Sequence, residues 1–245
     1  MSFEPTSKGN PYNFVINQHF HTAHAIGKFH NNNDKLDVYI IESGKVEQKH
    51  KRSKIFCAKR NWDQKTETII MHPIENKFHE EINNIKSYEL RNHHAISEYF
   101  LLWRTRHHFH ISRMDDIQLN GISDNSKLTK KQKETLENKG VIYSENNGVI
   151  PSRFMTGIQI SRQIDMQWSG IKKFKWGLLE AKEGEFIVSD CYNKFMFIPI
   201  SPTLAFCANY PDMIINKESI SNVNIQSIEQ STNFYFARDL KKCPL

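Results

Sequence analysis

Histidine is the residue type that first suggests chemistry in this sequence, because all twelve histidines lie within the first 110 of its 245 residues. The imidazole group can bind a metal ion, move a proton near neutral pH or contact a phosphate. An even scatter would seldom give such a distribution. The N-terminal half therefore has its own chemical character, although the histidines alone do not choose among these roles.

Two groups of histidines have a spacing that could suit a metal ion. His107 and His110 share a face of an expected helix, where Glu75 and His79 of a preceding helix could reach them. Di-metal helical bundles are built this way, but they use two Glu-x-x-His units, which the sequence lacks. We therefore interpret these histidines as hydrogen-bonded or exposed to solvent.

The second group lies in the segment HFHTAH, at residues 19–24. On a helix His21 and His24 would be one turn apart, and on a strand His19 and His21 would share a face. Metal binding is possible in either case and diagnostic in neither. The sequence also lacks a Walker-type loop, Gly-x-Gly-x-x-Gly, Gly-x-Ser-x-Gly and His-Glu-x-x-His, the usual signatures of NTP, dinucleotide, serine-hydrolase and zinc-protease chemistry.

A basic segment runs from Lys45 to Arg60, where seven Lys or Arg residues accompany one acid, Glu47. The whole chain has a net charge of +6, which favours anionic partners. Two interpretations stay open: a solvated pair of strands, or a surface that contacts nucleic-acid phosphates. In the second, the candidate nucleic-acid-binding residues are Lys49, Lys51, Arg52, Lys54, Lys59 and Arg60.

Composition places the chain among folded proteins. Apolar residues make up 38% and charged residues 24%, which excludes a disordered tail and a membrane protein. The longest apolar stretch, residues 99–103, is far shorter than the ~18 residues that a membrane span needs. The four cysteines form no Cys-x-x-Cys pair, and the first residues do not resemble a secretory signal. We therefore expect reduced thiols, a cytoplasmic location and no membrane partner.

The pattern predicts one α+β domain, with N-terminal and C-terminal strands around a central helical region. We divide residues 1–245 into a basic, histidine-rich strand region (12–70), a helical middle (74–170) and a strand-rich C-terminal part (174–240). The expected helices are 74–85, 94–110, 126–140 with Ser126 as its cap, 152–168 and 217–230. The expected strands are a hairpin at 36–48, then 54–59, a hairpin around Asn147-Gly148, and 176–181, 185–190, 195–200, 203–208 and 233–238.

The segment HFHTAHAIGKF at residues 19–29 resembles the opening motif of the family called domain of unknown function 4238, approximately His-Tyr-x-Pro-Gln-Phe-Tyr-Leu-x-x-Phe. Short matches follow in the family's order: IEN at 74–76, Arg104-Thr105, FIVSD at 186–190 and IPISP at 198–202. The family continues Ser-Asp-x-Pro where this chain has Cys191-Tyr192. The resemblance implies a common fold and common polar positions, but no function, because the family has none assigned.

The matching positions that could carry chemistry are His19, Glu75, Arg104 and Asp190. Together they would supply a base, two carboxylates for a divalent metal of unknown identity, and a cation to steady negative charge. Such a set suits phosphodiester hydrolysis. The alternative is a buried ion-pair network, for example from Glu75 to Arg104 between adjacent helices. Convergence of the four residues in one open pocket would favour catalysis.

Three hypotheses on function follow from the sequence. The first is a nucleic-acid-directed enzyme, a metal-dependent nuclease that acts as a toxin or defence effector. The second is a non-enzymatic binding or regulatory protein, in which the polar residues only hold the fold together. The third is an enzyme that acts on small phosphorylated molecules and has no need of the basic segment. The oligomeric state does not follow from the sequence.

Overall fold

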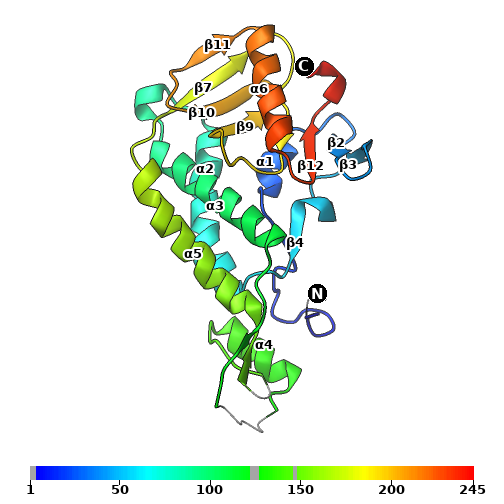
Figure 1. The fold of residues 1–245 in the computed structure, drawn as a ribbon, viewed down its shortest axis with the longest axis vertical. Coiled ribbons are helices and arrows are strands. Elements are labelled where there is room, and N and C mark those ends of the chain that lie inside the picture. Colours follow the sequence, from blue (N-terminus) through cyan, green and yellow to red (C-terminus); the bar gives the residue numbers. More distant parts are fainter. Residues whose placement is uncertain (1–3, 122–126, 146–147) are drawn as a thin grey trace.

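The computed structural model describes residues 4–121, 127–145 and 148–245. It confirms the α+β prediction: strands from both ends of the chain lie around a helical centre. Figure 1 shows an elongated molecule with a four-stranded sheet at one end and helix α4 (Lys130–Asn138) at the other. Three helices run between these ends and position the polar residues discussed below: α2 (His72–Asn83), α3 (His93–Ile111) and α5 (Ser152–Ile171).

One four-stranded sheet joins the two ends of the chain. Its strands are β2 (Leu36–Ile40), β3 (Lys45–Lys49), β8 (Val188–Ser189) and β12 (Phe234–Ala237), in the antiparallel order β3-β2-β12-β8. The predicted hairpin is confirmed, with Gly44 at a φ of +64° in its turn. β12 lies between that hairpin and β8, so the last strand completes a sheet that the first strands begin.

The second four-stranded sheet is built from the C-terminal part alone. Its strands are β7 (Trp176–Ala181), β9 (Phe197–Ser201), β10 (Leu204–Ala208) and β11 (Met213–Ile215), in the order β11-β7-β10-β9. The sequence did not predict β11, which has three residues and pairs parallel with β7. Helix α6 (Lys217–Gln230) has the predicted bounds, and its N-cap Asn216 accepts a hydrogen bond from Ser219 N.

Two short ribbons differ from the predicted pairing. Residues 54–59 begin as a 3-10 turn (Lys54–Phe56), and only β4 (Cys57–Lys59) is a strand, paired with β1 (Asn17–His19). β5 (Ile117–Gln118) pairs with β6 (Val149–Ile150). The hairpin predicted at Asn147-Gly148 falls partly outside the described residues, but Glu145 and Val149 on its two sides form an antiparallel bridge. β6, which follows the turn, also pairs with the distant β5.

The helices of the centre agree with the predicted periodicity. α2 (His72–Asn83) carries Pro73 in its first turn, as predicted, and follows a π-helical turn (Thr66–Met71). α2 ends before Ile85, which is therefore outside the helix. α3 (His93–Ile111) and α5 (Ser152–Ile171) occupy the expected ranges.

The shorter helical elements are α1 (Ala23–Gly27), α4 (Lys130–Asn138) and the 3-10 turns Tyr88–Leu90 and Leu240–Lys242. α4 begins later than predicted, because Thr129 and Gln132 form a capping box at its start. The predicted cap, Ser126, lies outside the described residues. Gly140, the predicted stop signal, has a φ of +70° just after the helix.

A single apolar cluster links nearly all of these elements. Trp62, Trp103 and Trp176 are at most 1% exposed and belong to the same cluster, together with Phe20 and Phe236 from the two ends of the chain. Burial of this core is the main contribution that holds the helices and sheets in place. Among the described residues, no helix has the length and apolar character needed to cross a membrane.

Candidate functional site

No hydrogen bond or ion pair among the described residues joins any two of the four residues predicted to carry chemistry. His19, at the end of β1, donates from Nε2 to the carbonyl oxygen of Lys51 at 3.0 Å. Burial lowers the pKa of His19, the hydrogen bond to Lys51 opposes this shift, and the charges of Arg106 and Glu75 act on it in opposite directions. Arg104 belongs to α3, and Asp190 follows β8 and contacts α3 through Trp103 and His107.

Glu75 of α2 binds Arg106 of α3, two residues after the expected partner Arg104. Arg106 is fully buried, and its Nη1 lies 2.5 Å from Oε1 of Glu75. Glu67 Oε2 is 3.6 Å from Nη2, and the Trp62 ring centroid is 5.4 Å from the guanidinium carbon. The alternative of a buried ion-pair network between adjacent helices is thus present at Glu75, with Arg106 as its cation.

Arg104 lines a cavity of about 250 Å³ between α3 and α5. The other residues at this cavity are all polar: Thr105, His108, Gln163, Gln167 and Asn193. Thr105 is 3% exposed, and its hydroxyl has no hydrogen-bond partner among the described residues. A cavity with one guanidinium and a ring of hydrogen-bonding groups suits a small anionic group.

Asp190 follows β8 and is 1% exposed. Its carboxylate accepts hydrogen bonds from the backbone N–H groups of Thr232 at 2.9 Å and Asn233 at 2.7 Å. Its backbone carbonyl accepts from Trp103 Nε1 at 3.0 Å. These bonds fix the segment after β8 against the start of β12 and against α3. They also place the Asp190 carboxylate 3.3 Å from Nε2 of His107.

His107, Asp190 and Cys191 form a buried group that could hold a metal ion. One ligand atom of each residue lies within 4.8 Å of the others, and among the described residues this is the one such group of three His, Cys, Asp or Glu side chains. The Cys191 thiol also receives a hydrogen bond from Asn193 Nδ2 at 3.4 Å. Asn193 lines the cavity at Arg104, so that cavity and the three-residue group share a neighbour.

The electrostatics of His107 depend on its two partners. Burial lowers the pKa of His107, but the adjacent Asp190 carboxylate and Cys191 thiol outweigh burial and raise it to about 9. The imidazole therefore carries a proton at neutral pH when no ion is bound. Nε2 has no well-directed hydrogen bond among the described residues, although a carboxylate oxygen is at ion-pair distance. Such a position can exchange a proton for a metal ion.

The other histidines make contacts that do not gather three ligands. His21 Nδ1 accepts from the Tyr99 hydroxyl at 2.7 Å, and its ring stacks on Trp103. His79 lies 3.0 Å from the Thr22 hydroxyl, and His110 stacks on Phe20. The interpretation of these side chains as packed or hydrogen-bonded fits their surroundings. Among the described histidines, only His107 lies close to both a carboxylate and a thiol.

The basic segment is only partly available to a nucleic acid. Arg60 is 6% exposed, and its Nη2 lies 2.6 Å from Oε2 of the buried Glu137, which corrects its assignment as a surface contact. Lys49 lies 2.5 Å from Glu47. Lys51 and Lys59 are half-buried, and Arg52 and Lys54 are exposed. The charges that remain accessible are fewer than the sequence suggests.

Comparison of the chain with protein-family models, curated proteins and solved structures gave no match. The resemblance to the family of domain of unknown function 4238 therefore stays a prediction. What can be said of function follows from the geometry of the chain itself.

Proposed function

We propose that this protein is a metal-dependent hydrolase of phosphodiester bonds, with nucleic acid as its substrate class, and that His107, Asp190 and Cys191 hold the ion. The observation that carries the proposal is the approach of a nitrogen, an oxygen and a sulfur donor to within 4.8 Å of one another among three buried residues. The toxin or defence role stays a prediction from the sequence.

The donor set favours a zinc-like cation. Imidazole, carboxylate and thiolate are the three ligand types of protein zinc sites, and magnesium and calcium prefer oxygen alone. Three protein ligands leave a fourth tetrahedral position for water or a substrate oxygen, as in catalytic zinc sites. A bound ion would supply an activated water and would polarise the phosphate.

The neighbouring cavity supplies the substrate contact. Arg104 is a cation there without an ion-pair partner among the described contacts, and Thr105, Gln163 and Gln167 offer hydrogen-bonding groups. A guanidinium stabilises the negative charge that develops on a phosphoryl group. In this proposal Asp190 and Arg104 keep the roles predicted for them, whereas His107 and Cys191 replace His19 and Glu75. The exposed Arg52 and Lys54 support contact with a nucleic-acid backbone.

The test measures bound metal and hydrolysis on the same protein. We expect the wild type to hold about one zinc-like ion per chain by elemental analysis, and to cleave DNA, RNA or bis(p-nitrophenyl) phosphate. Cys191→Ser and His107→Asn should lose most of the ion and the activity. The matched control is Cys207→Ser, a change to another buried cysteine, which lies on β10. Cleavage of the small diester without cleavage of nucleic acid would overturn the substrate class.

A second candidate, a non-enzymatic binding or regulatory protein, is favoured by a specific observation. Asp190 receives two close backbone N–H bonds and pairs with His107, which is also what a purely structural anchor requires. In that case the wild type binds no metal, shows no hydrolysis, and its melting temperature does not change on addition of a chelator. Cys191→Ser would then change bound metal, hydrolysis and melting temperature little or not at all. This result would favour the binding or regulatory protein over the hydrolase.

A further inference from the structure

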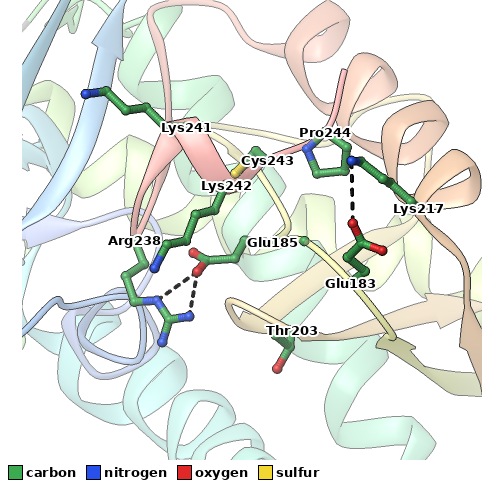
Figure 2. Close-up of a pocket in the computed structure, with 10 residues that line it drawn as sticks. Glu183, Glu185, Thr203, Lys217, Arg238, Lys241, Lys242, Cys243 and Pro244 are labelled. Atoms are coloured by element: carbon green, nitrogen blue, oxygen red, sulfur yellow. Dashed lines mark hydrogen bonds and ion pairs between the residues drawn. The ribbon is translucent and has the colours of Figure 1, made fainter.

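A second cavity lies apart from the three-residue group, between the C-terminal segment and the loop after β7 (Figure 2). Its volume is about 420 Å³, within the range of about 300–1,000 Å³ that small-molecule sites occupy. Its walls come from the β7–β8 loop, the start of α6, the end of β12 and the 3-10 turn near the C-terminus. Segments far apart in the sequence thus meet around one hollow.

The cavity is electropositive. Its cations are Lys217, Arg238, Lys241 and Lys242, and its acids are Glu183 and Glu185. Lys217 pairs with Glu183 at 3.5 Å, and this contact is exposed to solvent. Lys241 makes no ion pair among the described residues, and its side chain extends away from the acids in Figure 2. The first turn of α6 begins at Lys217 and adds the partial positive charge of a helix N-terminus.

One carboxylate that lines this cavity has an oxygen atom without a hydrogen-bond partner among the described residues. The Glu185 side chain is 3% exposed, and its Oε1 accepts both hydrogen bonds from Arg238, at 3.1 Å from Nε and 2.5 Å from Nη2. Its Oε2 is buried and has no hydrogen-bond partner among the described residues. A buried oxygen left without a donor is costly, so its presence points to a donor that arrives with a ligand.

Lys242 is the lysine drawn beside that carboxylate in Figure 2. Figure 2 shows the Lys242 side chain extending beside the Glu185 carboxylate and Arg238. The side chain is 62% exposed and has only a loose contact with Asp239, at 3.9 Å. A long lysine side chain held so weakly can swing toward an anion and open the path to Glu185.

We propose that this cavity binds a phosphorylated ligand of mononucleotide size. The exposed side chains of Lys241 and Lys242 turn toward its phosphate, and an N–H donor of its base binds Glu185. The lysines account for the anionic group, and the unpaired oxygen accounts for the donor. The site is separate from His107, Asp190 and Cys191, so it does not depend on the proposed hydrolase activity.

The proposed contact between the ligand phosphate and the lysines is tested by isothermal titration of the full chain with AMP. We expect Lys241→Gln/Lys242→Gln to bind AMP about tenfold more weakly or worse, because two charge-assisted contacts are lost. The matched control is Lys172→Gln/Lys173→Gln, the same change at two exposed lysines after α5. Equal affinity of the cavity variant and the control, or no AMP binding by the wild type, would overturn the proposal.

The proposed hydrogen bond from a base N–H group to Glu185 is tested with a matched pair of ligands. N6,N6-dimethyl-AMP keeps the phosphate but lacks the base N–H groups, so we expect it to bind the wild type no better than inorganic phosphate does. Equal affinity for AMP and its dimethyl derivative would remove Glu185 from the site. Bound metal and hydrolysis should be the same in the cavity variant and the wild type, which separates this test from that of the hydrolase.

Discussion

The Arg106 guanidinium is fully buried, and the fold compensates for its loss of water with several contacts. Glu75 provides the close ion pair, Glu67 a second carboxylate and Trp62 an aromatic face. Glu67 is itself fixed by a hydrogen bond from Trp62 Nε1. Arg106 therefore joins α3 to α2 and to the π-helical turn before α2.

Removal of one partner should leave a buried charge without its main compensation. We expect Glu75→Gln to lower the free energy of unfolding by about 3–5 kcal/mol, measured by urea denaturation. The control is Lys77→Gln on the same helix, which breaks an ion pair with Glu98 at 3.5 Å whose lysine is 52% exposed. This control should cost less than about 1 kcal/mol. Similar losses for the two variants would show that Arg106 does not rely on Glu75.

Two of the four residues predicted from the sequence, Arg104 and Asp190, belong to the candidate site, but their neighbours in the fold were not predicted. Arg104 and Arg106 both lie on α3. The motif resemblance pointed to Arg104 as the partner of Glu75, whereas the structure buries Arg106 against Glu75. Positions two apart on a helix face different directions, so the choice depends on which face packs on α2. His107 and Asp190 are 83 residues apart in the sequence. Backbone groups just before β12 hold Asp190 beside α3, and no local sequence pattern predicts this contact.

At the scale of the element, two glycines of α5 have opposite surroundings. A Cβ at Gly157 would lie 2.1 Å from Asp63 Oδ2 and 2.3 Å from Thr66 Oγ1. Asp63 accepts hydrogen bonds from the backbone N–H and the hydroxyl of Thr66, which begins the π-helical turn. A Cβ at Gly170 would meet nothing within 4 Å. Gly157 therefore allows α5 to pack closely against residues 63–66, whereas Gly170 faces open space.

The two glycines give a matched test within one helix. Gly157→Ala should lower the melting temperature and cost about 1–3 kcal/mol, because α5 must move away from Asp63. Gly170→Ala should stabilise by about 0.5–1 kcal/mol, because alanine is the better helix former. Thermal unfolding of both variants is the measurement. A stable Gly157→Ala variant would contradict the close approach of α5 to residues 63–66.

Periodicity predicted the long elements well and the short ones poorly. α3, α5 and α6 each repeat the helical spacing over several turns, and the hairpin at 36–48 has both alternation and a turn signal. β11 has three residues, too few for a pattern, and it exists because β7 offers hydrogen bonds. The predicted strand 185–190 is present only as the two residues of β8. The partner of residues 57–59 depends likewise on the tertiary fold rather than on the adjacent hairpin.

For the whole molecule, we expect buried histidines to contribute to the response to acid. Burial lowers the pKa of His21 from 6.5 to about 3 and that of His79 to about 4. A histidine whose pKa is lower in the folded state stabilises the fold fully above about pH 6.5. That stabilisation decreases as the pH falls below 6.5, because the unfolded chain takes up the proton first.

We therefore expect the free energy of unfolding to decrease by a few kcal/mol between pH 6.5 and pH 4, measured by urea denaturation at each pH. His21→Phe should flatten part of this slope, because it keeps the stacking on Trp103 and removes the titrating group. His72→Gln, a change at an exposed histidine, is the control. An unchanged slope in His21→Phe would show that the acid response arises elsewhere.

The position of β12 governs the order in which this protein can be completed during synthesis. Residues 234–237 supply the central strand between the N-terminal hairpin and β8, and the backbone donors of 232 and 233 hold Asp190. Those residues leave the ribosome after α1 to α6 have emerged. The β2–β3 hairpin therefore lacks its central neighbour, and the nascent chain gains its candidate metal ligands in their final arrangement, only once residues 232–237 have been made.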